Sequence, residues 1–188
     1  MKAGWLGCFA AMMLAMPVAA QECFAGKPTK VTYDDGRVIT IIQRHGDDIT
    51  YTEPYEGFQD SVIKTHMMLI PKASRRGARV TDFRWTSSLP KLKAMVPGYH
   101  FNIKGMMKSG DGKPVPYRNE GDVVSQGVVK VGACSYDVVV ITTSSFLDEQ
   151  LISVATDYLS PDMMVVMKSE ISVMSAGTQV RRAVVAIE

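Results

Sequence analysis

The stretch YLSPDMMVVMKSEISV, residues 158–173, decides the fold class of this protein. Ser160-Pro161-Asp162-Met163 suits a type I turn, because proline fixes φ at the second position and aspartate is tolerated at the third. After it, apolar and polar side chains alternate, as in a strand with one buried face. The apolar face carries Met163, Val165, Met167, Ile171 and Val173, interrupted by Ser169. The pattern predicts a turn followed by a half-buried strand.

Segments of the same kind fill most of the remaining chain. Asp34-Asp35-Gly36 between two runs of β-formers predicts a hairpin, and turn residues separate the later runs at regular spacing. Candidate strands lie at 31–33, 37–44, 49–55, 61–70, 80–85, 99–107, 123–131, 136–146, 151–159, 163–173 and 179–187. Glu53 lies on an otherwise apolar strand face. We therefore predict an all-β fold, a single antiparallel sandwich or open barrel.

Three segments depart from the strand pattern. Residues 86–98 are the one plausible helix, short at best, with a serine to cap it and Pro97-Gly98 to stop it. Residues 72–79 are polar and predict a loop. The Gly- and Pro-rich residues 108–122 do not suit a central strand.

Residues 1–20 have the layout of a secretory signal peptide: Lys2, an apolar core and a Val-Ala-Ala ending. We expect cleavage between Ala20 and Gln21, which leaves residues 21–188 as a single β-rich domain. No later segment is apolar over the length that a membrane span needs. These features predict export to the periplasm, with secretion to the medium as the alternative.

Charge and cysteine content narrow the possible partners. The chain has 21 basic and 19 acidic residues, and this near balance argues against nucleic acid as a partner. Cys23 and Cys134 are the cysteines that remain after cleavage, and an oxidising compartment favours a disulfide between them over two buried thiols.

No metal or cofactor site is predicted. The three histidines, His45, His66 and His100, lack metal-ligand spacing. Paired methionines such as Met67-Met68 could in principle bind Cu(I), but neighbouring strand residues point to opposite faces, so we interpret them as core residues.

No catalytic residue is predicted either. S-x-x-K occurs at Ser61–Lys64 and at Ser88–Lys91, but Ser61 lies in a candidate strand, whereas acyl-transfer enzymes with this motif carry the serine on a helix. With no nucleophile beside a base, we predict that the protein is not an enzyme, and an uncharacterised hydrolase is the least favoured alternative.

The residues Tyr158, Ser160, Pro161, Asp162, Val166, Lys168, Ser169 and Glu170 give the pattern Y-x-S-P-D-x-x-x-V-x-K-S-E. This ending resembles the last strands of open-barrel periplasmic proteins similar to the lipoprotein carrier LolA, and of envelope proteins with a YxPxxGxVxK ending. The resemblance covers the C-terminal part of the chain, and Met164 stands where those proteins often have glycine. It implies a periplasmic barrel without catalytic residues.

We therefore predict a non-enzymatic exported envelope protein whose curved sheet binds a lipid, a lipoprotein or another apolar ligand. The alternative is a structural or protein-interaction module with a solid core, which binds an envelope protein partner. Candidate ligand-facing residues are Tyr51, Tyr55, Met67, Phe83, Trp85 and Phe101. A basic cluster predicts either a contact patch for anionic groups or a solvated loop; its arginines are Arg75, Arg76, Arg79 and Arg84.

Overall fold

A computed structural model of the chain describes residues 22–55 and 58–188, except for the side chains of residues 55 and 58–60. The predicted signal peptide and the cleavage site between Ala20 and Gln21 lie outside the described residues. In the described part of the chain, no helix has the length and hydrophobicity needed to cross a bilayer.

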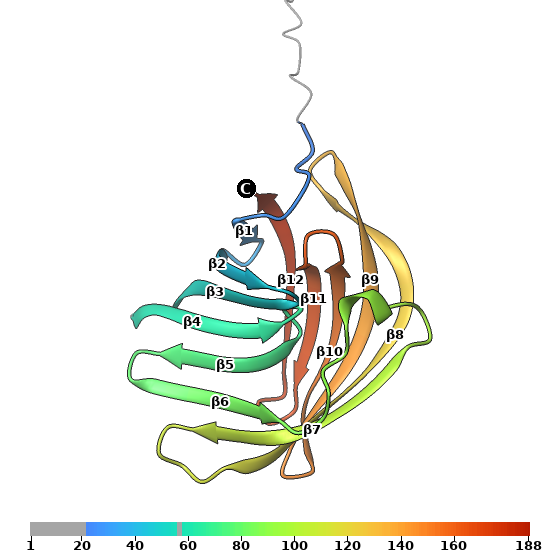
Figure 1. Ribbon diagram of the computed structural model, residues 1–188. Helices are drawn as coiled ribbons and strands as arrows, with labels where there is room; N and C mark the ends of the chain where they lie inside the picture. Colours follow the sequence, from blue (N-terminus) through green and yellow to red (C-terminus); the bar gives the residue numbers. More distant parts are fainter. Residues whose placement is uncertain (1–21, 56–57) are drawn as a thin grey trace, which may run out of the picture.

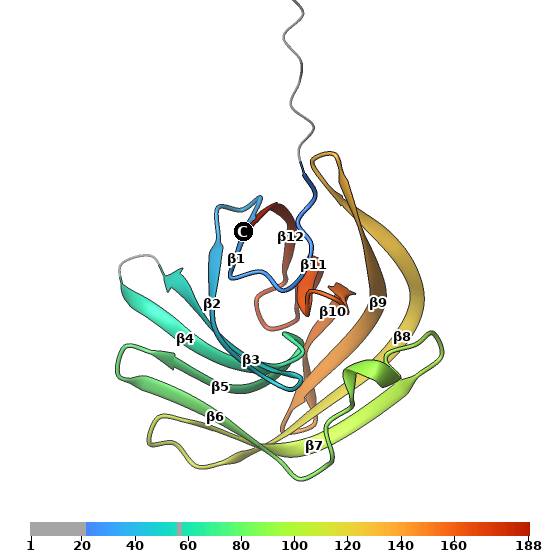
Figure 2. The same ribbon diagram turned by 45° about the horizontal axis from the view of Figure 1, so that its top comes forward.

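The described residues form twelve β-strands that follow one another around a closed antiparallel barrel (Figure 1). The strands are β1 Lys30–Tyr33, β2 Val38–His45, β3 Asp48–Tyr55, β4 Phe58–His66, β5 Ile70–Arg76, β6 Arg79–Trp85, β7 His100–Ser109, β8 Val115–Val131, β9 Cys134–Leu147, β10 Gln150–Ser160, β11 Val165–Val173 and β12 Thr178–Ile187. Figure 2 shows the wall curving from β2–β6 round to the long strands β8 and β9.

The predicted all-β antiparallel fold is confirmed, but the sheet is a closed barrel rather than a sandwich or an open barrel. Closure comes from β1, which pairs with β2 on one side and with β12 on the other. At this seam Val31 pairs with Ile187. Alternation along a strand shows that one face is buried, but it carries no information about a pairing between the two ends of a chain. Each of the twelve described strands thus has a neighbour on both sides, although the closing seam is short: β1 pairs only with residues 38–40 of β2 and residues 184–187 of β12.

Two predicted irregular segments are in fact strands. Residues 72–79 are not a loop but the hairpin between β5 and β6, which turns at Gly77, where φ is +58°. Residues 108–122 contain the end of β7 and the start of β8. Pro116 stands second in β8, where a missing backbone N–H is tolerated because β9 pairing begins only at Tyr117.

Two other predictions also need correction. Residues 86–98 contain one 3₁₀ turn, Leu92–Ala94, because Pro90 and Pro97 leave too few residues between them for an α-helix. The candidate strand 61–70 is split between β4 and β5. Met67 and Met68 form the turn between them, with φ of 53° and 57°.

The turns alternate between two ends of the barrel, because neighbouring strands run in opposite directions. One end, which we call the disulfide end, carries turns 46–47, 67–69, 132–133 and 161–164 and the connection 86–99. The other, which we call the arginine end, carries turns 34–37, 77–78, 110–114, 148–149 and 174–177.

The disulfide end is packed with apolar side chains and held by a covalent cross-link. Cys23 and Cys134 form the predicted disulfide, which ties the segment before β1 to the start of β9. Methionines from the turns and strands pack into the two apolar clusters of the core; the nearly fully buried ones are Met67, Met95, Met163, Met164 and Met167. Met164 has φ of 53°, a strained value for a side chain with a Cβ, and its burial in the core offsets that cost.

Candidate functional site

The interior of the barrel contains a cavity of about 210 Å³. Side chains from both ends border it: Met68 and Leu69 from a turn at the disulfide end, and Arg37 from a turn at the arginine end. Its apolar lining includes Tyr33, Ile39, Tyr51, Tyr117, Val166 and Ile171. Its polar lining includes Asn119, Thr143, Ser145, Ser153, Asp157, Ser169 and Arg182. The cavity is therefore amphipathic, which fits a ligand with both kinds of surface.

Three polar residues form a row across the cavity wall. Asp157 on β10 pairs with Ser169 on β11, and Ser169 pairs with Arg182 on β12, so the three side chains lie on one face. Ser169 Oγ donates a hydrogen bond to Asp157 Oδ1 at 2.5 Å. This row places an acid and a base of opposite charge on the same wall of the cavity.

Burial raises the pKa of Asp157 to about 6, although the Ser169 hydrogen bond and the Arg182 charge both act to lower it. Part of the Asp157 surface borders the cavity, but protein surrounds it on nearly every other side. The carboxyl group therefore changes its charge between mildly acidic and neutral pH.

Arg182 has an unmet donor. Its Nε is buried and donates no hydrogen bond to any of the residues that the structure describes. Arg37, by contrast, donates to Glu53 at 3.1 Å. A guanidinium has five N–H donors, and withdrawing it from water without acceptors costs free energy. Arg182 is thus a partly buried cation in the cavity lining, and its Nε donor is unmet.

Asn119 leaves a second polar group unmet. This residue is 3% exposed, and its Nδ2 donates to Ser145 Oγ at 3.0 Å. Its Oδ1 is buried without a partner in the described part of the chain. Buried amide oxygens are nearly always hydrogen-bonded, so this orphaned atom marks the cavity as a place for a further polar group.

The tyrosines of the cavity remain neutral. Burial raises the pKa of Tyr51 to about 12, and burial also raises the pKa of Tyr33 well above its usual range. Tyr33 Oη donates to the Val166 carbonyl oxygen at 2.9 Å. These rings supply apolar surface and hydrogen bonds to the cavity, but no charge.

The predicted ligand-facing residues are spread over several environments. Tyr51 lines the cavity, whereas Met67 and Phe101 belong to the apolar core. Phe83 and Trp85 pack edge-on against Tyr117, with ring centroids 5.0 and 5.5 Å away. The side chain of Tyr55 lies outside the described residues. Among the five predicted residues whose side chains are described, Tyr51 is the one that lines the cavity.

The predicted basic patch is divided between two faces, because its arginines alternate along paired strands. Arg76 and Arg79 border a hollow together with Ser74 and Thr81. Arg76 lies 3.7 Å from Glu53, and Arg79 Nε donates to Ser109 Oγ at 3.0 Å. Arg75 and Arg84 are exposed and, by strand alternation, point to the opposite face. The four arginines do not form one contact surface.

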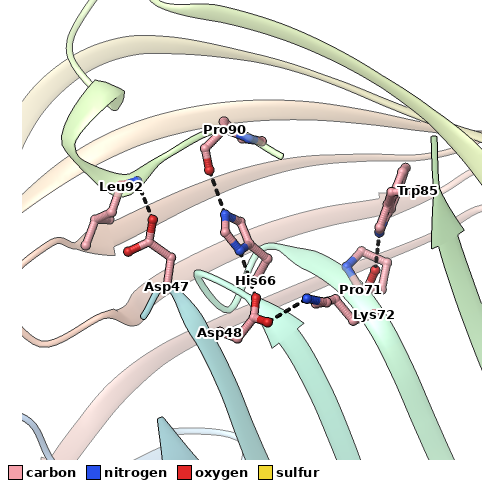
Figure 3. Close-up of polar contacts among 8 residues, drawn as sticks. All are labelled: Asp47, Asp48, His66, Pro71, Lys72, Trp85, Pro90 and Leu92. Atoms are coloured by element: carbon pink, nitrogen blue, oxygen red, sulfur yellow. Dashed lines mark hydrogen bonds and ion pairs between the residues drawn. The ribbon is translucent and has the colours of Figure 1, made fainter. Parts of the chain in front are cut away.

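An acid–histidine pair closes the disulfide end (Figure 3). His66 Nδ1 lies 2.9 Å from Asp48 Oδ1, and His66 Nε2 donates to the Pro90 carbonyl oxygen at 2.6 Å. Burial tends to raise the pKa of Asp48, but hydrogen bonds from Lys72 and His66 bring it below its usual value. Because Pro90 occupies the nitrogen that would act as a base, this pair fastens the connection 86–99 to β4.

Two further bonds hold the same region. Leu92 N donates to Asp47 Oδ2 at 3.0 Å, and Trp85 Nε1 donates to the Pro71 carbonyl oxygen at 2.8 Å (Figure 3). Within residues 22–55 and 58–188, no group of three or more His, Cys, Asp or Glu side chains could hold a metal ion.

Sequence reasoning did not single out Asp157, Arg182 or Asn119. Each stands in a strand, at a position whose alternation places it on the inner face. A polar residue at an inward-facing strand position is the signal that could have revealed them. It becomes readable only once the strand register around the barrel is known.

Replacing Asp157 by Asn is expected to stabilise the protein by about 2 kcal/mol at pH 7.5. The folded pKa is raised, so ionisation of Asp157 opposes folding, and the penalty is absent at low pH and complete above about pH 6. The advantage of Asp157→Asn should therefore shrink as pH falls from 6 to 4. Urea unfolding across this range measures it, with Asp162→Asn in an exposed turn as the control. Parallel pH profiles for wild type and Asp157→Asn would contradict the assignment.

Comparison with known proteins gives a likeness in fold. No family model matches the chain, and no curated protein matches its sequence. A solved structure described as the hypothetical lipoprotein YmcC from Escherichia coli (K12) is similar, with a TM-score of 0.53 and 7% sequence identity. The likeness covers 84% of this chain and 82% of that one. At this identity it shows a shared barrel fold, and the LolA resemblance of the sequence stays a prediction.

Proposed function

We propose that this protein is a non-enzymatic exported envelope protein that holds a small amphipathic molecule inside its barrel. Export is supported by the signal-like N-terminal sequence and by the Cys23–Cys134 disulfide, which needs an oxidising compartment to persist. The likeness in fold to a hypothetical lipoprotein is compatible with a place in the envelope.

The observation that carries this proposal is the cavity with unmet polar groups. A solid-core module gains nothing from a buried guanidinium Nε and a buried amide oxygen without partners, and each costs stability. A ligand that supplies those hydrogen bonds would recover the cost. The polar lining favours such a ligand over a purely apolar one.

The size of the cavity limits the ligand. About 210 Å³ has room for roughly seven waters, and pockets for drug-sized ligands begin near 300 Å³. A whole lipid does not fit within this volume. A lipid could be bound only with its chains leaving through the arginine end.

The test is native mass spectrometry of the protein purified from its own periplasm. We expect a small non-covalent mass on the wild-type protein and its loss in Ala155→Phe, which fills the cavity from β10. Val154→Phe, at the neighbouring residue on the opposite face, is the matched control and should keep the mass.

Other outcomes would decide between the alternatives. A bound mass that extracts into organic solvent as a lipid would support the lipid carrier. A bare wild-type chain that crosslinks to envelope proteins would support the interaction module and overturn the proposal.

A further inference from the structure

The net charge of the cavity wall depends on whether Asp157 is ionised or protonated. Arg37 pairs with Glu53, which is 5% exposed and also lies 3.7 Å from Arg76, an exposed residue outside the cavity lining, and the nearby tyrosines are neutral. What remains on the wall is Arg182 and Asp157. When Asp157 is ionised the two cancel, and when it is protonated one positive charge is left without a counterion.

This balance selects the kind of anion that fits. A monocarboxylate beside Arg182 restores neutrality when Asp157 is protonated, whereas a phosphate dianion would leave a buried negative charge in excess. The planar guanidinium of Arg182, which borders the cavity, can also bind a carboxylate through two parallel hydrogen bonds. The tyrosine and aliphatic lining can then contact the apolar part of the ligand.

We propose that the cavity is a proton-coupled site for a small monocarboxylate, whose anionic group binds Arg182 while Asp157 takes up one proton from solvent. This inference rests on the proposed function and adds the chemical class of the ligand. The unpartnered Oδ1 of Asn119, elsewhere in the cavity lining, is an acceptor, so it can bind a hydroxyl or N–H donor on the ligand but not its carboxylate.

Few other ionisable groups face Asp157. Ser169 faces it from β11 and Arg182 from β12, and Tyr33 faces it from β1 with Arg37 and Tyr51 behind. On β9 the neighbours are Ile141, Thr143 and Ser145. Asp157 is the group among these that titrates between pH 5 and 7, so the bound proton is assigned to it. A carboxylate on Arg182 adds negative charge nearby and favours the protonated form further.

The experiment measures binding of benzoate and hexanoate, with benzamide and hexanamide as their neutral counterparts, by calorimetry in two buffers of different ionisation enthalpy. Both acids are small enough for the cavity. We expect binding of at least one acid to be about tenfold tighter at pH 6 than at pH 7.5, with uptake of close to one proton at the higher pH.

Two pairs of variants locate the effect. Arg182→Gln should lower affinity for the acid at least tenfold, while Arg181→Gln, at the exposed neighbouring residue, should leave it unchanged. Arg182→Gln removes a side chain whose Nε has no hydrogen-bond partner, and it is expected to fold. Asp157→Asn should keep binding but abolish both the proton uptake and the pH dependence.

The outcomes separate this inference from the proposed function. If the amides bind as well as the acids, and Ala155→Phe blocks both, the cavity binds ligands but the anion site is wrong. If acid binding survives Arg182→Gln, the anion site is also wrong. If neither acids nor amides bind and the purified protein carries no ligand, both proposals fail.

Discussion

Replacing Cys23 and Cys134 together by serine is expected to lower the free energy of unfolding by about 4–5 kcal/mol. The disulfide joins residues 111 apart in the sequence, and closing so long a loop removes much conformational entropy from the unfolded chain. Urea unfolding of the double variant beside wild type measures the difference. For a domain of this size the loss is a large fraction of total stability.

Wild type in a reducing agent should match the double variant, and the same agent should leave the double variant unchanged. The segment before β1 has other contacts, because Phe24 packs against the core and Arg44 Nη2 donates to the Pro28 carbonyl oxygen at 2.8 Å. If these contacts suffice to hold the segment, the double variant will be as stable as wild type, and the expectation is wrong.

Replacing Gly105 by Ala is expected to destabilise the barrel by about 3 kcal/mol. Gly105 on β7 pairs with Trp85 on β6, and a Cβ there would overlap the Arg84 carbonyl oxygen and lie 2.9 Å from Trp85 Cα. Both obstacles are backbone atoms, so no side-chain rotation can relieve the overlap. The two strands would have to separate locally, which breaks ladder hydrogen bonds.

Gly127→Ala is the matched control, since a Cβ at this residue of β8 meets only Val138 Cγ2 at an ordinary 3.9 Å. Chemical denaturation of the two variants gives the comparison, and amide I infrared or far-ultraviolet circular dichroism spectra confirm that each retains its sheet. Equal stabilities for Gly105→Ala and Gly127→Ala would show that β6 and β7 can move apart at little cost.

The sequence predicted the strands better than their arrangement. Alternation of apolar and polar residues is local, so most of the strands from β1 to β12 could be placed from it. The strand β5 was missed because residues 72–76 are mostly polar on both faces, a pattern that predicts a loop, whereas its partner β6 matches the candidate strand 80–85. Closure was missed because the pairing of Val31 with Ile187 depends on the curvature of the whole sheet.

Two polar residues on apolar strand faces are visible in the sequence, but the alternation of apolar and polar residues does not explain them. Glu53 and Ser169 each interrupt an apolar strand face, and both are nearly buried, at 5% and 3% exposed. Glu53 binds Arg37, and Ser169 binds Asp157. Asp157 comes from another strand and Arg37 from a turn, so the interruptions could be noticed in the sequence but their cause required the register of the barrel.

The seam between β1 and β12 has a consequence for biogenesis. The backbone N–H groups of Thr29 and Lys30 donate hydrogen bonds to the Glu188 carbonyl oxygen and complete the wall. Strand β1 therefore gains its second partner only when β12 is present. Contacts between such distant residues form slowly. A polypeptide that emerges from a translocation channel N-terminus first would hold β1 half-paired until the final strand arrives. During that interval the unpaired edge of β1 could pair with a strand of another chain, unless folding is fast or a chaperone covers the edge.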